Sequence, residues 1–176
     1  LVSLLHSLPD LQCEGEILHN YVPFPHLHVL GRSARSKTGS YGCKILSYQL
    51  RDVQTALEMP ETFLRTLHDK NDFHILYLRR TNLLRHALSN IRARREKFHR
   101  KQANHPQERT ALHVDPEHVV EWMNRSKALR TYEQQLLKGV PHLSLTYEEH
   151  LRDPSAHQST VNLVCEYLGI ESAPAE

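Results

Sequence analysis

Two adjacent arginines, Arg79 and Arg80, stand at the end of an apolar run that is typical of a strand over residues 73 to 79. A guanidinium can bind a phosphate group through two parallel charge-assisted hydrogen bonds. Ser89 follows nine residues after Arg80, on a helix predicted over residues 82 to 99, and can add a hydroxyl group. These residue types at this spacing suit an anionic ligand. The alternative is that both arginines only flank the strand and pair with carboxylates.

A second pattern, His26 and His28, has the HxH spacing of a metal-binding pair. Zinc sites take at least three protein ligands, and no third ligand at a useful spacing accompanies these two histidines. No HExxH motif and no Cys/His zinc pattern occurs in the sequence. We therefore expect a pair of loop histidines and no metal.

The elements that must position these residues alternate between strands and helices. Asp115 and Pro116 form a typical helix start, and Gly139 a typical helix end. Residues 22 to 40 carry prolines, glycines and serines without periodicity, which predicts a mobile loop. The predicted strands cover residues 41–50, 73–79 and 142–147, and residues 13–18 form a short link or a further strand. The predicted helices cover residues 1–8, 60–70, 82–99, 115–138 and 158–169.

Strands separated by long helices predict a parallel sheet, because parallel neighbours need crossover connections. The expected fold class is α/β, a three-layer sandwich with a central parallel sheet, in a single domain over residues 1–176. Ligands of such sheets bind beyond the carboxyl ends of the strands. Arg79 and Arg80 would lie at such an end, which favours them as anion ligands.

Composition limits the function classes. The chain has 176 residues, enough to bury a core without disulfides, and its formal net charge of +2 indicates no general nucleic-acid binder. Cys13, Cys43 and Cys165 form no CxxC pair, and their odd number fits a reducing compartment. No apolar run reaches the ~20 residues of a membrane span, and no signal peptide is visible. We expect a soluble, cytoplasmic protein without a nucleic-acid partner.

Four segments resemble, in the same order, the sulfotransferases that use 3′-phosphoadenosine 5′-phosphosulfate (PAPS). "LYLRRTNLLRHALS" resembles their 3′-phosphate-binding strand and helix, and "LVSLLHSLPDLQCEGEIL" resembles the region after their 5′-phosphosulfate loop. "YGCKILSYQL" resembles a core strand with Gly and Lys, and "LSLTYEEHLRDP" resembles a late strand followed by a Tyr-Glu pair and Pro. The most similar type is the bacterial carbohydrate and glycolipid sulfotransferases of the trehalose-sulfating kind. The resemblance covers residues 1 to about 170.

The resemblance implies a P-loop-like sulfotransferase fold and a sulfuryl transfer from PAPS to a hydroxyl group of a carbohydrate or glycolipid. It implies that Arg80 and Ser89 bind the 3′-phosphate and that Tyr147 lies near the adenine, with core packing as the alternative for Tyr147. Glu148 and Glu149 are expected to be solvated or to cap a helix.

The resemblance also makes Glu16 the candidate general base, which takes the proton from the acceptor hydroxyl. Glu14, two residues earlier, is a rival. His19 is a further candidate, because histidine is the base in other branches of the family, but it is ranked below Glu16. Lys44 either stabilises the leaving phosphate or, as we prefer, ends a strand with a solvated ammonium group.

Two parts of the family pattern are not visible. The Gly- and Ser-rich phosphosulfate loop should precede Leu1, and a basic segment should occur before Glu176. The chain also starts inside an apolar helical pattern without Met or an N-cap, so we expect a fragment of a longer protein. Activity is then expected of the parent enzyme rather than of the fragment.

Two hypotheses from other classes remain. The basic stretch "RARREKFHRK" at residues 92 to 101 could bind RNA or an acidic polysaccharide, although its single Phe98 offers little base stacking. A solvated helix end is favoured for this stretch. The chain could also be a non-catalytic scaffold that has kept the fold. In the enzyme interpretation, residues 22–40 and 92–109 shape the acceptor pocket.

Overall fold

The computed structural model describes the backbone of residues 1–100 and 114–175 and the side chains of residues 1–94 and 114–175. Four strands in these ranges form two parallel pairs. β1 (Leu11–Glu16) pairs with β2 (Ser40–Lys44), and β3 (Ile75–Arg79) pairs with β4 (His142–Thr146). The mixed α/β class with parallel strands is therefore confirmed. Hydrogen bonds join the strands as two separate pairs, so a single central sheet stays a prediction.

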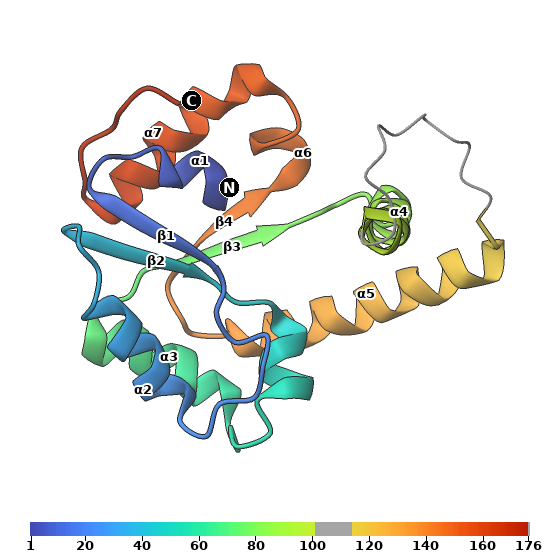
Figure 1. Cartoon of the computed structure of the whole chain (residues 1–176), viewed down its shortest axis with the longest axis horizontal. Helices are drawn as coiled ribbons and strands as arrows, with labels where there is room; N and C mark the ends of the chain where they lie inside the picture. Colours follow the sequence, from blue (N-terminus) through green and yellow to red (C-terminus); the bar gives the residue numbers. More distant parts are fainter. Residues whose placement is uncertain (101–113, 176) are drawn as a thin grey trace.

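Helices lie on both sides of the strands. Figure 1 shows α1 and α7 on one side and α2 and α3 on the other, with α4 and α5 extending away from the strands. The helices are α1 (Val2–His6), α2 (Pro25–Ser33), α3 (Pro60–Asn71), α4 (Leu83–Arg100), α5 (Pro116–Leu136), α6 (Tyr147–His150) and α7 (His157–Leu168).

Two apolar clusters occupy the two sides. The first joins α1 and α7 to β1 and β4, and its buried members are Leu4, Leu5, Leu8, Leu11, Leu145, Val161, Val164 and Cys165. The second joins α2, α3 and the end of α5 and contains Leu18, Val29, Leu50, Phe63, Leu64, Leu67 and Leu136. Successive side chains of a strand point to opposite faces. Cys13 of β1 lies opposite Gly42, the residue before Cys43 of β2, so the two cysteines point to opposite faces. Cys13 contacts the first cluster and Cys43 the second.

The prediction of one loop over residues 22–40 is wrong, because α2 occupies the middle of this segment. Pro25 stands at the first helical position, where its fixed φ suits a helix and its missing N–H costs nothing. Val29 is fully buried in the second cluster, and His26 Nε2 lies 2.9 Å from Asn71 Oδ1 of α3. Burial against another helix outweighs the local proline and glycine signals.

The strand predicted over residues 41–50 is too long, because β2 ends at Lys44. The amide oxygen of buried Gln49 accepts a hydrogen bond from the backbone N–H of Leu46 at 3.0 Å. This contact turns the chain into a short π-helical turn, Gln49–Val53. Apolar residues after β2 therefore pack in a turn and not in an extended strand.

The capping signals of the long helix are confirmed. Asp115 caps α5 by accepting a hydrogen bond from the backbone N–H of Glu117 at 3.0 Å. Gly139 follows the helix with φ +73°, a left-handed conformation that suits glycine.

α4 and α5 pack on each other through a third cluster that contains Ala87, Ile91 and Val119. The guanidinium of Arg94 lies over the ring of Trp122, 4.6 Å from its centroid. The side chains from residue 95 onward in the basic stretch 92–101 lie outside the described residues, as do residues 101–109 of the predicted acceptor segment. No helix in the described ranges combines the length and apolar character that crossing a membrane requires.

Candidate functional site

The structure brings Arg80 and Tyr147 together. Arg79 of β3 lies opposite Thr146 of β4 in the parallel register, so the next residue of each chain segment leaves the pair at the same edge. The Arg80 guanidinium carbon lies 3.9 Å from the centroid of the Tyr147 ring. Within the described residues no carboxylate forms an ion pair with the Arg80 guanidinium. For Arg80, the alternative of a strand-flanking arginine paired with a carboxylate is therefore not seen.

A second arginine fixes the backbone at this position. Arg130 of α5 donates a hydrogen bond from Nη2 to the carbonyl oxygen of Arg80 at 2.6 Å. The same helix presents Glu133, which accepts hydrogen bonds from the hydroxyl groups of Tyr77 at 2.7 Å and of Ser47 at 2.6 Å. The C-terminal part of α5 is thus joined to β3, to the residue that follows it and to the segment after β2 by polar contacts.

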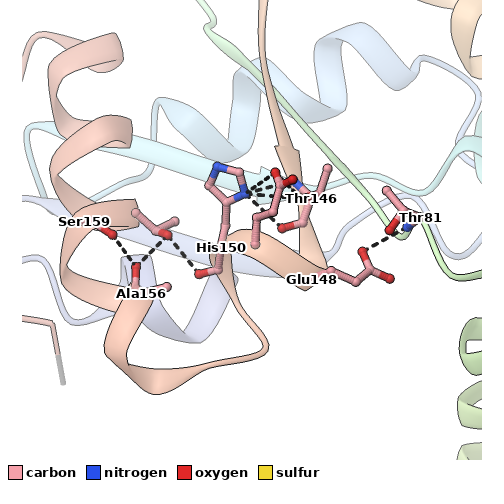
Figure 2. Close-up of polar contacts among 8 residues, drawn as sticks. Thr81, Thr146, Glu148, His150, Ala156 and Ser159 are labelled. Atoms are coloured by element: carbon pink, nitrogen blue, oxygen red, sulfur yellow. Dashed lines mark hydrogen bonds and ion pairs between the residues drawn. The ribbon is translucent and has the colours of Figure 1, made fainter.

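Glu148, from another element, binds the two backbone N–H groups that directly precede α4. Its two carboxylate oxygens accept hydrogen bonds from the backbone N–H groups of Thr81 at 2.9 Å and Asn82 at 3.0 Å, and Figure 2 shows the contact with Thr81. Partial desolvation would raise the pKa of Glu148, but the hydrogen bonds from Thr81 and Asn82 outweigh it and lower that pKa to about 2. Glu148 is therefore not simply solvated, because it binds the two N–H groups that lead into α4.

α6, which carries Tyr147 and Glu148, is itself tied to its neighbours. The Thr146 hydroxyl donates to the Glu149 carboxylate at 2.9 Å. Thr160 of α7 donates to the carbonyl oxygen of His150 at 2.8 Å, and Figure 2 shows the His150 ring in contact with Thr146. The short helix is therefore held between β4 and α7.

His86 is a half-buried histidine of α4 beside this edge of the strands. Burial lowers its pKa, and the nearby positive charge of Arg80 lowers it further. Arg130, Glu133 and Glu148 also act on it electrostatically. His86 is therefore surrounded by charged groups from three other segments.

Ser89 lies three residues after His86 and so shares its side of α4. It is exposed, and in the described part of the chain no hydrogen bond joins its hydroxyl group to Arg80. Ser89 is thus on the side of α4 that carries His86, but it makes no hydrogen bond to Arg80 among the described residues.

Glu16 ends β1 on the other pair of strands. Its Oε1 accepts from the ammonium group of Lys44 at 2.8 Å, and its Oε2 accepts from the Gln49 amide at 3.0 Å. His19 Nδ1 lies 2.7 Å from the backbone oxygen of Glu16. Lys44 ends β2 and its side chain is 43% exposed, in line with the preferred solvated ammonium group, while the parallel register also places it opposite Glu16.

An open pocket of about 480 Å³ lies beside Glu16. It is lined by Glu14, Gly15, Glu16, Ile17, His19, Asn20, Val22, His28 and Arg32. Glu14 accepts hydrogen bonds from Arg32 Nε and the Tyr41 hydroxyl, both at 2.9 Å. Burial, followed by the nearby Cys43 and the contacts with Glu14, raises the pKa of Tyr41. Glu14, like Glu16, is therefore a hydrogen-bonded acid of the pocket wall.

The wall of this pocket also depends on a residue with no sequence signal. Gln54 is fully buried, and its amide nitrogen donates to the carbonyl oxygens of Leu18 at 2.9 Å and Asn20 at 2.7 Å. Its amide oxygen accepts from the backbone N–H of Val22 at 3.0 Å. Gln54 thus shapes the segment that carries His19.

The two histidines of the HxH pair lie in different surroundings. His26 bonds to Asn71, while His28 lines the pocket. In the described ranges, no group of three His, Cys, Asp or Glu side chains is arranged to hold a metal ion.

The two groups of predicted residues occupy different strand pairs. Arg80, Tyr147 and Ser89 belong to the β3–β4 side, and Glu16 belongs to the β1–β2 side. No hydrogen bond or ion pair between described residues joins Glu16 to Arg80. A ligand that uses both groups would have to bridge the carboxyl ends of the two pairs.

Sequence reasoning did not find Arg130, Glu133 or His86. Arg130 and Glu133 belong to no motif, and His86 lies within the segment LYLRRTNLLRHALS without a signal of its own. The packing of α4 and α5 brings them to this edge. Comparison of the chain with protein-family models, curated proteins and solved structures finds no match.

Proposed function

We propose that the chain is part of a sulfotransferase that moves a sulfuryl group from PAPS to a hydroxyl group of a carbohydrate or glycolipid. The observation that carries this proposal is the contact of Arg80 with Tyr147 at the shared carboxyl end of β3 and β4. Two residues from separate motifs, both expected to bind the same nucleotide, lie against each other. A cytoplasmic location and the absence of a nucleic-acid partner belong to the same proposal.

The fold supports the proposal in general form. All four strands are parallel in their pairs, and helices cover both sides, as a three-layer sandwich with a P-loop-like sulfotransferase fold requires. In that fold the two pairs belong to one sheet, and the carboxyl ends of its strands form the binding edge.

The proposed roles follow from the side chains at this edge. The Arg80 guanidinium binds the 3′-phosphate by charge-assisted hydrogen bonds, and Ser89 adds a hydroxyl group after a side-chain rotation. The Tyr147 ring, which Arg80 covers on one face, contacts the adenine through its other face or its hydroxyl group.

Glu16 is the proposed general base. Lys44 and Gln49 each bond one carboxylate oxygen and so fix its orientation. Each oxygen keeps a further lone pair, so the carboxylate can still accept the proton of an acceptor hydroxyl group in the adjacent pocket. PAPS supplies the sulfuryl group that this hydroxyl oxygen receives.

Nucleotide binding tests the proposal. The intact protein should bind 3′-phosphoadenosine 5′-phosphate more tightly than 5′-AMP, measured by isothermal titration calorimetry. Arg80→Ala should weaken binding of the bisphosphate by about 1.5–3 kcal/mol, or roughly ten- to a hundredfold, because a charge-assisted contact is lost. It should change binding of 5′-AMP little.

Arg79→Ala is the matched control, since Arg79 is the exposed last residue of β3 and directly precedes Arg80. Its affinity for the bisphosphate should stay close to that of the unmodified protein. Equal losses in the two variants would contradict the assignment of Arg80. Tight nucleotide binding without any sulfuryl transfer would instead favour the non-catalytic scaffold.

A further inference from the structure

We infer that Glu148 is a positioning residue that sets the Arg80 guanidinium for the nucleotide phosphate. The inference rests on the proposed function and assigns this site a residue outside the predicted ligand set. It depends on the contacts of the chain segment from Arg80 to Asn82.

Both ends of one peptide unit are held by charged side chains. The carbonyl oxygen of Arg80 accepts from Arg130 at 2.6 Å, and the N–H of Thr81, in the same peptide plane, donates to Glu148 at 2.9 Å. The next N–H, that of Asn82, donates to Glu148 at 3.0 Å. The peptide plane after Arg80 is therefore held. Since Arg79 before it is held in register with Thr146, Arg80 lies between two held segments, which limits the direction in which its side chain leaves the backbone.

Glu148 and its neighbour act on the same target. Tyr147 lies under the Arg80 guanidinium, and Glu148 binds the two N–H groups that directly follow Arg80. Two consecutive residues of α6 thus hold the side chain and the backbone of this arginine. The contact spans 67 positions of sequence, so it depends on the pairing of β3 with β4.

Helix capping alone does not account for this contact. Asn82 already caps α4, because its side-chain oxygen accepts from the backbone N–H of Arg85 at 2.9 Å. The bond to Thr81 lies outside α4, which begins at Leu83. Glu148 also occupies two N–H groups that could otherwise bind an anion, so the phosphate has to be bound by side chains such as Arg80.

The sign of the mutational effect separates positioning from a simple charge effect. A nearby carboxylate repels a phosphate, so a Glu148 that acted only through its charge would weaken nucleotide binding, and its removal would strengthen it. A Glu148 that positions Arg80 has the opposite effect. Glu148→Gln, which loses the charge and one acceptor oxygen, should then weaken binding.

The experiment is calorimetric titration of the intact protein with 3′-phosphoadenosine 5′-phosphate at pH 7.5. We expect Glu148→Gln to lower the affinity by about tenfold, comparable to the loss of one charge-assisted hydrogen bond. Glu149→Gln removes the same charge from the same helix, where the carboxylate bonds the Thr146 hydroxyl group, and should leave the affinity nearly unchanged.

A double-mutant cycle shows whether Glu148 acts through Arg80. In an Arg80→Ala background, Glu148→Gln should have almost no further effect on affinity, because the group that it positions is gone. Glu148→Asp, which keeps the charge but loses reach, should weaken binding only while Arg80 is present.

Unchanged or tighter binding by Glu148→Gln would overturn the inference, as would an equal loss in the Arg80→Ala background. Either result would leave the proposed function standing as long as the unmodified protein binds the bisphosphate. An unmodified protein that does not bind the bisphosphate would overturn both.

Discussion

The Glu16 carboxylate is oriented by two hydrogen bonds and still has free acceptor positions. Its two oxygens each accept one hydrogen bond, from Lys44 and from Gln49, and the pocket opens beside it. A carboxylate has about four acceptor positions. The remaining positions suffice for a hydroxyl group that enters the pocket.

The first prediction at this scale concerns turnover. Glu16→Gln keeps the shape of the side chain but loses the base, so the sulfuryl-transfer rate of the intact protein should fall about 10²–10⁴-fold. Calorimetry should show nearly unchanged affinity for the nucleotide. The rate is measured with saturating donor and a carbohydrate acceptor.

The control for this prediction has to be chosen with the structure. Glu14 is unsuitable, because it pairs with Arg32 and Tyr41. Glu58, exposed in the segment before α3 and without a partner among the described residues, serves instead as Glu58→Gln. A Glu16→Gln protein with close to normal turnover would remove Glu16 from the mechanism and make His19 the next residue to test.

At the scale of the element, β3 and β4 offer a direct comparison of burial. Leu78 and Leu145 are partners in the parallel register, yet Leu145 is fully buried and Leu78 is 38% exposed. Leu145→Ala should lower the free energy of unfolding by about 2–5 kcal/mol, because it leaves a cavity in the first cluster. Urea unfolding measures this loss.

Leu78→Ala is the matched change and should cost far less, since about two fifths of its side chain already contacts water. Equal losses in the two variants would mean that the Leu78 and Leu145 side chains are buried alike in solution.

Elements with strong local signals could be predicted from the sequence. The Asp115-Pro116 start of α5 and the glycine after α7 act through a few neighbouring residues, so the pattern alone is sufficient. α2 and the end of β2 could not be predicted in this way. Val29 and Gln49 are defined by burial and by side-chain bonds to distant segments.

The same distinction applies to the site. The proximity of Arg80 and Tyr147 follows from a general rule, since parallel strands end at one edge. The roles of Arg130, Glu148 and Gln54 depend on distances between side chains and distant backbone groups, which no local pattern contains. The sequence pattern therefore points to the residues proposed as ligands, whereas the residues that hold them in place are found only in the structure.

At the scale of the whole molecule, His86 makes stability depend on pH. Burial, followed by the charge of Arg80, lowers its pKa in the folded state below the unfolded value of about 6.5. The unfolded chain then binds the proton more readily, so the contribution of this group is retained above about pH 6.5 and is lost as the pH falls below it. The charge of Arg130 also lowers the pKa of His86, whereas the charges of Glu133 and Glu148 raise it.

His86→Gln should therefore lose less stability than the unmodified protein between pH 7.5 and pH 5. Urea unfolding at the two pH values measures the difference. His6→Gln, at the exposed end of α1, is the control and should follow the unmodified protein. A larger acid loss in His86→Gln would contradict the lowered pKa.

The register of β3 and β4 has a consequence for insertions and deletions. Arg80 and Tyr147 meet only while Arg79 lies opposite Thr146. Adding or removing one residue within either strand would turn every following side chain to the other face. Evolution can therefore change the length of the connections around these strands, whereas within them it can exchange residue types but not their number.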